Sequence, residues 1–305
     1  MIDGNALAAQ LRQTLDDELQ VLRLSAVQPG LATVMVGEDY AARAYEKHLR
    51  RLSEGLEYRY VSEQLPEDVE VADVLATIGK LNLDPRITGI LVLRPLPPSL
   101  PEAEINNAID PLKDIEASHP ANTGLLALGR PRFIPSTPAS CFYLLDSYLR
   151  SKGEDPATYY SGRTITIVGR STSVGLPAQW LALQRNATVV VCHSHTAKAG
   201  RLAEFTSEAD ILLVAAGIPR LVTGEMVREG TIVVDVGTNA EKDPETGKSR
   251  LVGDVDFESV AEKAEAITPV PGGVGPITDV WLVGNALVAA ALSARVEPRF
   301  GGSHS

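Results

Sequence analysis

Short β-branched runs alternate with helix-like segments along this chain, and that alternation limits the folds open to it. Two continuous apolar runs, 31–36 and 88–93, are bounded by glycine or proline and are typical of strands buried on both faces. Helical patterns at 40–53 and 70–82 lie between them. Strands connected through helices pair in parallel, so the sequence predicts an α/β fold.

The second half of the chain repeats this scheme over a longer stretch. Further apolar runs occur at 164–168, 187–191, 211–215 and 231–236. Helical patterns separate them at 174–185, 198–207 and 222–228. This half is predicted to be a Rossmann-like, doubly wound parallel sheet. The polar stretch 151–162 is the best domain boundary, dividing a first domain, 1–150, from a second, 151–278.

Composition excludes several functional classes. The 305 residues leave room for about two domains, and 44% apolar with 22% charged residues is ordinary for a globular protein. A net charge of −11 argues against nucleic acid as a partner. Two cysteines, Cys141 and Cys192, are too few for a disulfide framework or a zinc site, so we expect a reducing compartment and no metal.

The ends of the chain carry no targeting pattern. No signal sequence is recognisable, and no apolar run approaches the roughly 18 residues of a membrane span, so a soluble cytoplasmic protein is expected. The tail 299–305 is expected to be disordered.

The segment 267–278 predicts a ligand-binding loop. Its residues 268–275 contain two prolines and three glycines, which fix an irregular backbone and allow a flat ligand to approach the main chain. An ordinary Gly/Pro turn is the alternative. The apolar residues before the loop and the helical pattern 281–294 after it indicate a strand, a loop and a helix.

A nucleotide signal follows the run 164–168. Gly169, Arg170, Ser171 and Gly175 stand between a predicted strand and a predicted helix, where backbone donors suit a pyrophosphate. NAD enzymes place a carboxylate on the ribose at the end of the next strand, but this chain has 192–196, Cys-His-Ser-His-Thr, there. Arg170 without a carboxylate fits a 2′-phosphate, so NADP is preferred to NAD. For His193 and His195 a solvated strand end is the simpler interpretation.

Several segments together resemble one family, the bifunctional methylenetetrahydrofolate dehydrogenase/methenyltetrahydrofolate cyclohydrolases. The matching pieces are spread over nearly the whole chain: 36–37, 89–92, 95–97, 111–115, 119–120, 135–138, 169–171, 192–194, 235–239, 253–257 and 268–276. The resemblance implies a homodimer with an N-terminal folate domain, a central NADP domain and a helix, 279–296, that returns to the first domain. It implies cofactor contacts from Gly169, Arg170, Ser171, Ser194, Thr238, Gly275 and Thr278, and substrate contacts from Pro271, Gly272 and Gly273.

The chain departs from the family pattern at the expected folate site. Tyr45 keeps the family tyrosine and is expected to stack on the substrate, but Leu49 stands where the resemblance implies the catalytic lysine. Leu93 stands at the family glutamine, Ala42 at the serine, and Glu116 at the aspartate that recognises the pterin. Lys47 points away from Tyr45 on a helix, and His48 is a less certain substitute for the lysine.

These departures affect the family's two reactions differently. Hydride transfer from the methylene carbon to the nicotinamide depends chiefly on positioning and needs no side-chain base. Opening the methenyl cation with water needs proton transfer, which a leucine cannot provide. The expected function is NADP-dependent dehydrogenation of methylenetetrahydrofolate with cyclohydrolase activity lost or severely reduced.

Three alternatives stay open. Leu49 and Leu93 could pack together as core residues in an inactive copy. The drier pocket could serve another substrate in a specialised pathway, because a site that lacks hydrogen-bond partners discriminates against its old ligand. The protein could also bind folate or NADP without turnover. Elsewhere, Asp254 is expected to be structural, Asp256 to cap a helix, His119 to belong to the scaffold, and Cys141 to the core.

Overall fold

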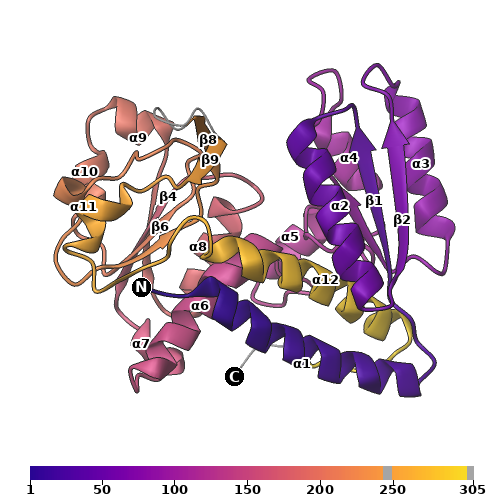
Figure 1. Cartoon of the computed structure of the whole chain (residues 1–305), viewed down its shortest axis with the longest axis horizontal. Helices are drawn as coiled ribbons and strands as arrows, with labels where there is room; N and C mark the ends of the chain where they lie inside the picture. Colours follow the sequence, from indigo (N-terminus) through magenta and orange to yellow (C-terminus); the bar gives the residue numbers. More distant parts are fainter. Residues whose placement is uncertain (243–248, 301–305) are drawn as a thin grey trace. The chain divides into compact units, whose positions relative to one another are not determined.

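The computed structural model describes residues 1–242 and 249–300, and the chain divides into two compact units (Figure 1). Of the described residues, the N-terminal unit contains Arg12–Pro135 and Asp279–Phe300, and the central unit contains Met1–Leu11 and Ser136–Thr278. Each unit has a parallel β-sheet with helices, and the central one is Rossmann-like. The predicted two-domain α/β class is therefore confirmed.

A three-stranded sheet in the order β2-β1-β3 forms the centre of the N-terminal unit. Its strands are β1 (Gly30–Val36), β2 (Arg59–Leu65) and β3 (Gly89–Val92). The helices of this unit are most of α1 (Gly4–Leu24), then α2 (Tyr40–Gly55), α3 (Val71–Leu83), α4 (Glu102–Ala108) and α5 (Pro120–Ala127). All seven residues of β1 are buried, because a central parallel strand is covered on both faces.

Residues 279–293 of the last helix, α12 (Val274–Ser293), pack inside this unit. The Asn285 amide donates to the carbonyls of Ile115, at 2.7 Å, and Ile134, at 2.8 Å. Thr88 and Tyr58 donate hydroxyl hydrogen bonds to other carbonyls of the helix. The expected return of the C-terminal helix thus rests on polar anchors as well as apolar contacts.

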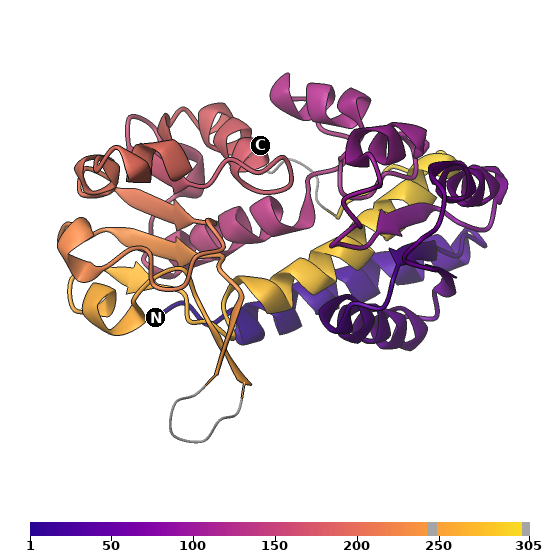
Figure 2. The same ribbon diagram turned by 90° about the horizontal axis from the view of Figure 1, so that it is seen from above.

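A five-stranded parallel sheet in the order β10-β7-β6-β4-β5 forms the central unit. Its strands are β4 (Thr164–Val168), β5 (Thr188–Cys192), β6 (Ile211–Val214), β7 (Ile232–Asp235) and β10 (Ala266–Ile267). Its helices are α6 (Ser136–Ser151), α7 (Pro156–Tyr159), α8 (Gly175–Gln184), α9 (Ser194–Lys198), α10 (Leu202–Thr206), the 3₁₀ turn η1 (Gly224–Met226) and α11 (Phe257–Ala261). A separate hairpin, β8 (Asn239–Lys242) and β9 (Ser249–Val252), projects from the unit in Figure 2.

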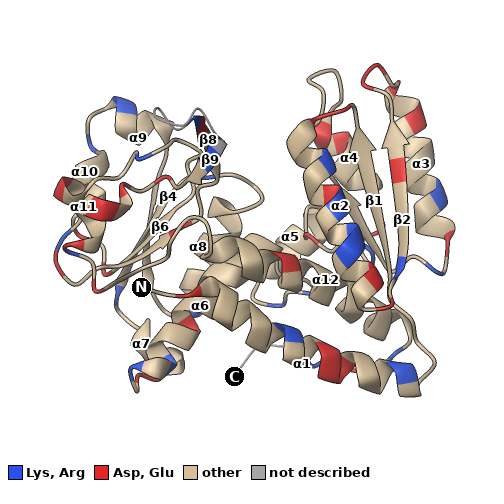
Figure 3. Ribbon diagram, viewed as in Figure 1, with Lys and Arg blue, Asp and Glu red and all other residues tan. Residues whose placement is uncertain are grey.

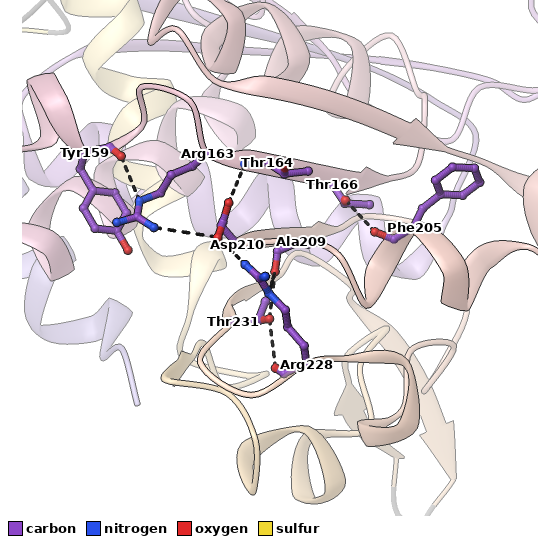
Figure 4. Close-up of polar contacts among 9 residues, drawn as sticks. All are labelled: Tyr159, Arg163, Thr164, Thr166, Phe205, Ala209, Asp210, Arg228 and Thr231. Atoms are coloured by element: carbon purple, nitrogen blue, oxygen red, sulfur yellow. Dashed lines mark hydrogen bonds and ion pairs between the residues drawn. The ribbon is translucent and has the colours of Figure 1, made fainter.

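Polar side chains tie together the amino ends of the central strands (Figure 4). Asp210, just before β6, accepts a hydrogen bond from the Thr164 backbone N–H at 2.7 Å and pairs with the Arg228 guanidinium. Arg163 stacks on the Tyr159 ring, with its guanidinium carbon 4.0 Å from the ring centre. A cavity of about 370 Å³ lies beside Arg163 and Asp210. It lies at the amino ends of the strands. In such folds nucleotides bind at the opposite end of the sheet, next to the carboxyl ends of the strands.

The structure corrects several predicted boundaries. The division between the units lies at Pro135–Ser136 rather than at 150–151, because α6 groups with the central unit, where it contacts α8. The helix expected at 198–207 is two short helices, α9 and α10, with Gly200 at φ +70° between them, and the helix expected at 222–228 is only η1. Strands β2, β8 and β9 were not predicted, whereas β10 is the strand expected before the loop.

The segment 267–278 is less irregular than predicted, since α12 begins at Val274 and only 268–273 lie between β10 and the helix. Asp256 precedes α11 but makes no side-chain cap; its carboxylate accepts a hydrogen bond from the Ser259 hydroxyl at 2.6 Å instead. Asp254 is structural, as predicted: its carboxylate accepts backbone hydrogen bonds from Ala216 and Gly217.

The end of the chain also differs from the expectation. Phe300 is buried, and its ring centre lies 5.3 Å from that of Trp281, because Gly284 leaves room for an aromatic ring against α12. The rest of the predicted tail, 301–305, lies outside the described residues.

Within the described part of the chain, α12 alone is long and apolar enough to cross a membrane, contrary to the expectation that no run approaches that length. Because 72% of its most apolar window is buried inside the protein, we assign it as a core helix.

Candidate functional site

Helix α2 positions the first candidate residues of the N-terminal unit. Its start is fixed by Asp39, whose carboxylate accepts a hydrogen bond from the Ala42 N–H at 2.8 Å. Tyr45 and His48 are three residues apart and therefore lie on one face. Leu49 is fully buried, so the position that corresponds to the family lysine contributes only apolar surface.

Asp279, in the second turn of α12, meets both of these polar side chains. Its Oδ2 lies 3.0 Å from Nε2 of His48, and the Tyr45 hydroxyl donates a hydrogen bond to the same carboxylate. Burial raises the pKa of the Tyr45 hydroxyl well above its usual range, and the charges of Asp279 and Glu116 raise it further. The hydroxyl is therefore a neutral donor at physiological pH.

Burial raises the pKa of the Asp279 carboxyl above its ordinary value, and the charge and hydrogen bond of His48 and the hydrogen bond from Tyr45 offset only part of that rise. The side chain of Asp279 is 22% exposed and that of His48 is 54% exposed. The pair therefore lies at the edge of the buried region. Sequence reasoning did not select Asp279, and nothing in its local sequence marks it.

A tight loop between α4 and α5 contains Glu116. The Asp114 carboxylate holds this loop by accepting hydrogen bonds from the backbone N–H groups of Ser118 and His119, at 3.0 and 2.9 Å. On the other side, the carbonyl of Ile115 accepts from Asn285 of α12. The electrostatic effect of Glu116 on Tyr45 shows that the structure brings these two predicted residues together. His119 caps α5 through Nδ1, which accepts from the Ala121 N–H, in agreement with its predicted scaffold role.

Nearby cations have other partners. Arg94, which follows the buried Leu93, binds Glu102 and Asn106 of α4. Lys113 donates to three backbone carbonyls around the end of α3. Lys47 is exposed on another face of α2 than Tyr45. Neither leucine therefore has a cationic replacement among these side chains.

The central unit contains the candidate nucleotide residues. Gly169 has φ +129°, and a Cβ there would lie 2.1 Å from the carbonyl oxygen of Ala215, so only glycine fits. Ser171 stabilises the following turn by accepting from the N–H groups of Val174 and Gly175, at 3.1 and 3.4 Å. The loop after β4 thus has the compact form that the sequence predicted for a pyrophosphate site.

Strand pairing brings the predicted 2′-phosphate residues together. Val168 at the end of β4 pairs with Cys192 at the end of β5, so the residues that follow each strand are neighbours. Desolvation lowers the pKa of His193, and the positive charge of Arg170 lowers it further, which places Arg170 beside the end of β5. Ser194, the first residue of α9, is exposed there. Residues 192–196 contain no carboxylate.

Two aspartates, Asp235 and Asp254, support the loops after β6 and β7. Sequence reasoning identified only Asp254 as a structural residue. The Asp235 carboxylate accepts from the N–H groups of Gly237, Asp254 and Val255, at 2.9 to 3.0 Å. Asp254 in turn accepts from the Asn239 amide at 2.8 Å. Thr238 is exposed between these anchors, as a ligand-contacting residue must be.

The N-terminus of the chain fixes the loop 268–273. The Gly4 N–H donates to the Gly272 carbonyl at 2.9 Å, and a Cβ on Gly4 would lie 1.8 Å from the Gly273 oxygen. Gly272 has φ +103°, and the Val270–Pro271 peptide is cis. Beyond the loop, a Cβ on Gly275 would meet nothing within 4 Å, whereas the Thr278 hydroxyl already bonds to Val274 and Ser140.

Comparison with known protein families shows which family this chain belongs to. The catalytic-domain model of tetrahydrofolate dehydrogenase/cyclohydrolase matches residues 2–116, and the NAD(P)-binding-domain model of the same name matches residues 135–294. The chain belongs to the tetrahydrofolate dehydrogenase/cyclohydrolase family.

Relatives in this family match over their whole length. Bifunctional protein FolD 3 of Rubrobacter xylanophilus is 55% identical over 309 residues, covering 100% of this chain and 97% of the relative. A crystal structure of the bifunctional FolD enzyme from Campylobacter jejuni has a TM-score of 0.86 at 37% identity and covers 95% of this chain and 98% of that one. The Trypanosoma brucei enzyme, solved with NADP cofactor and inhibitor, has a TM-score of 0.88 at 33% identity and covers 97% of this chain and 98% of its own.

Proposed function

We propose that this protein oxidises methylenetetrahydrofolate to methenyltetrahydrofolate with NADP, and that its cyclohydrolase activity is lost or severely reduced. Membership of the tetrahydrofolate dehydrogenase/cyclohydrolase family supports the substrate and the reaction class. One observation carries the division between the two activities. Leu49 is fully buried at the position that the resemblance assigns to the family lysine, and the charged groups that most strongly raise the pKa of Tyr45 are two acids, Asp279 and Glu116.

The residues of the central unit fit NADP. Gly169 lets the loop after β4 pack closely against the Ala215 carbonyl, and the open space at Gly275 allows a ligand to approach the backbone. Arg170 beside His193 and Ser194 supplies a positive charge and donors for a 2′-phosphate. The NADP in the T. brucei relative supports the same choice. A homodimer located in the cytoplasm is part of this proposal.

The side chains of the N-terminal unit would bind and orient the folate. Tyr45 offers a ring for stacking and a neutral hydroxyl, and Glu116 offers a carboxylate to the pterin. NADP, when bound, accepts the hydride. Positioning of the two planar rings supplies much of the rate of such a transfer, so the missing lysine does not prevent it. Hydrolysis is different, because a general acid or base typically contributes about a hundred- to ten-thousand-fold.

Two assays on the wild-type protein test the proposal. We expect NADPH to form with methylenetetrahydrofolate, and methenyltetrahydrofolate to be hydrolysed at a rate close to that in buffer. The double variant Leu49→Lys/Leu93→Gln, which restores the family residues, should raise hydrolysis at least about tenfold. Leu49→Met/Leu93→Met is the matched control, since it conserves volume without adding a polar group. Hydrolysis by the wild-type protein well above buffer would refute the predicted loss.

A further inference from the structure

We propose that the Asp279 carboxylate stabilises the positive charge that develops on the folate when hydride leaves, so that this site favours oxidation and opposes hydrolysis. This inference rests on the proposed function and adds to it the reason why one reaction is kept and the other is lost.

Asp279 is the only charged residue of α12, a helix that is otherwise tan in Figure 3. The buried residues around it on the helix are apolar, including Val280, Leu282 and Val283. A carboxylate in such surroundings is costly unless it has donors or a nearby cation, and His48 and Tyr45 supply two donors. Because both His48 and Tyr45 donate to it, the Asp279 carboxylate fits the ionised form, which only accepts hydrogen bonds.

The charges that face this carboxylate are few. On α2, His48 pairs with it and Tyr45 is neutral. On the loop between α4 and α5, Glu116 is a second acid near Tyr45. Leu49 stands where the resemblance implies a lysine, so Tyr45 has two acids and the His48 imidazole near it. Apolar Leu49 and Leu93 strengthen the remaining electrostatic interactions, because they exclude water from this region.

The chemistry of the reaction makes this charge useful. Hydride loss breaks one C–H bond of the methylene carbon and carries both bonding electrons to NADP⁺, which is reduced to NADPH. The folate carbon is left between two nitrogens that share a positive charge. A carboxylate held beside Tyr45 attracts that charge, and therefore binds the transition state and the product more tightly than the neutral substrate. Water attack discharges the same cation, so a site that stabilises it slows hydrolysis.

The test compares ligands that differ in this charge. Tetrahydrofolate has the same pterin and glutamate tail as methenyltetrahydrofolate but no cationic carbon, so the ratio of their dissociation constants isolates the effect. In Asp279→Asn the Kd of methenyltetrahydrofolate relative to that of tetrahydrofolate should rise at least about tenfold, and kcat for NADPH formation should fall by a similar factor. Asp279→Glu keeps the charge and should stay within about threefold of wild type. Glu54→Gln removes an exposed acid from α2 and should leave the Kd ratio unchanged.

The outcomes separate this inference from the proposed function. If wild type forms NADPH with methylenetetrahydrofolate but folded Asp279→Asn has the wild-type Kd ratio, the role of Asp279 is refuted and the dehydrogenase assignment stands. If wild type binds neither folate, both fail. A raised ratio in Asp279→Asn that Asp279→Glu does not share supports the inference, because a purely structural role would weaken both ligands alike.

Discussion

Asp235 shows how one buried side chain can organise a ligand site without touching a ligand. It is 4% exposed and holds three backbone N–H groups from two separate loops. Burial raises its pKa to about 6, and the nearby Asp254 also raises it. Its hydrogen bonds thus organise the loop that presents Thr238 while its ionisation opposes folding.

This raised pKa predicts a pH dependence of stability. The folded protein holds the Asp235 proton more tightly than the unfolded chain does, so the stabilisation is complete below about pH 4 and is lost as the pH rises through 6. The shift corresponds to about 3 kcal/mol in the free energy of unfolding. Urea unfolding from pH 4 to 7 measures it, with Asp235→Asn as the non-titrating reference. If wild type and variant keep a constant difference over that range, the assignment is wrong.

The candidate folate site shows which residues sequence reasoning could find. Tyr45, Leu49, Leu93 and Glu116 were selected because each lies at a fixed offset within a local motif. Asp279 was missed because its partners His48 and Tyr45 belong to a helix far away in the sequence. Only the packing of α12 inside the N-terminal unit shows that these two residues have an acid beside them.

Strand β3 illustrates how one element positions two others. Gly89 begins this strand, and a Cβ there would lie 2.8 Å from a methyl of Ile115 and 3.2 Å from Cβ of Ala286. The glycine therefore allows the loop of Glu116 and the helix of Asp279 to approach the sheet together. Through these two contacts β3 positions the loop and the helix that carry the candidate site residues.

Gly89→Ala is expected to displace that loop and α12. Overpacking of this kind costs about 1–3 kcal/mol, so the free energy of unfolding should fall and the KM for the folate should rise. Gly79→Ala in α3 is the control, because a Cβ there meets nothing within 4 Å. A helix gains up to about 1 kcal/mol from this change. Equal effects of the two substitutions on unfolding by urea would contradict the argument.

The unpredicted strand β2 has a physical explanation. It has the sequence Arg-Tyr-Val-Ser-Glu-Gln-Leu and lies at the edge of its sheet, so it is only half-buried and lacks a continuous apolar run. Buried central strands such as β1, β4 and β6 were predicted because both of their faces must be apolar.

The candidate ligand-binding residues of the whole molecule are divided between the two units. Their effects on ligand binding can therefore be measured separately. Arg170 belongs to the central unit, and Tyr45, Glu116 and Asp279 belong to the N-terminal unit. Distant sites without shared partners usually contribute additively to binding.

We therefore expect Arg170→Gln to lower the affinity for NADP by at least about tenfold, because a guanidinium that binds a 2′-phosphate has no equivalent role for NAD. Affinities for NAD and for tetrahydrofolate should stay close to wild type. Arg201→Gln, which removes an exposed arginine paired with Glu204 in the same unit, is the control. Titration of each ligand, followed by fluorescence or calorimetry, gives the comparison. Parallel losses for NADP and NAD would remove Arg170 from the 2′-phosphate site.

The sequence alone determined the fold class, the family and the identity of the residues at the family's positions, because these depend on local periodicity and on motifs of fixed spacing. The tertiary structure decided the rest. It assigned α6 to the central unit, buried Phe300 against Gly284, and brought Asp279 to His48 and Tyr45. Each of these depends on contacts between segments far apart in the chain, and such contacts are fixed by shape and by hydrogen-bond geometry, which no local pattern of residues records.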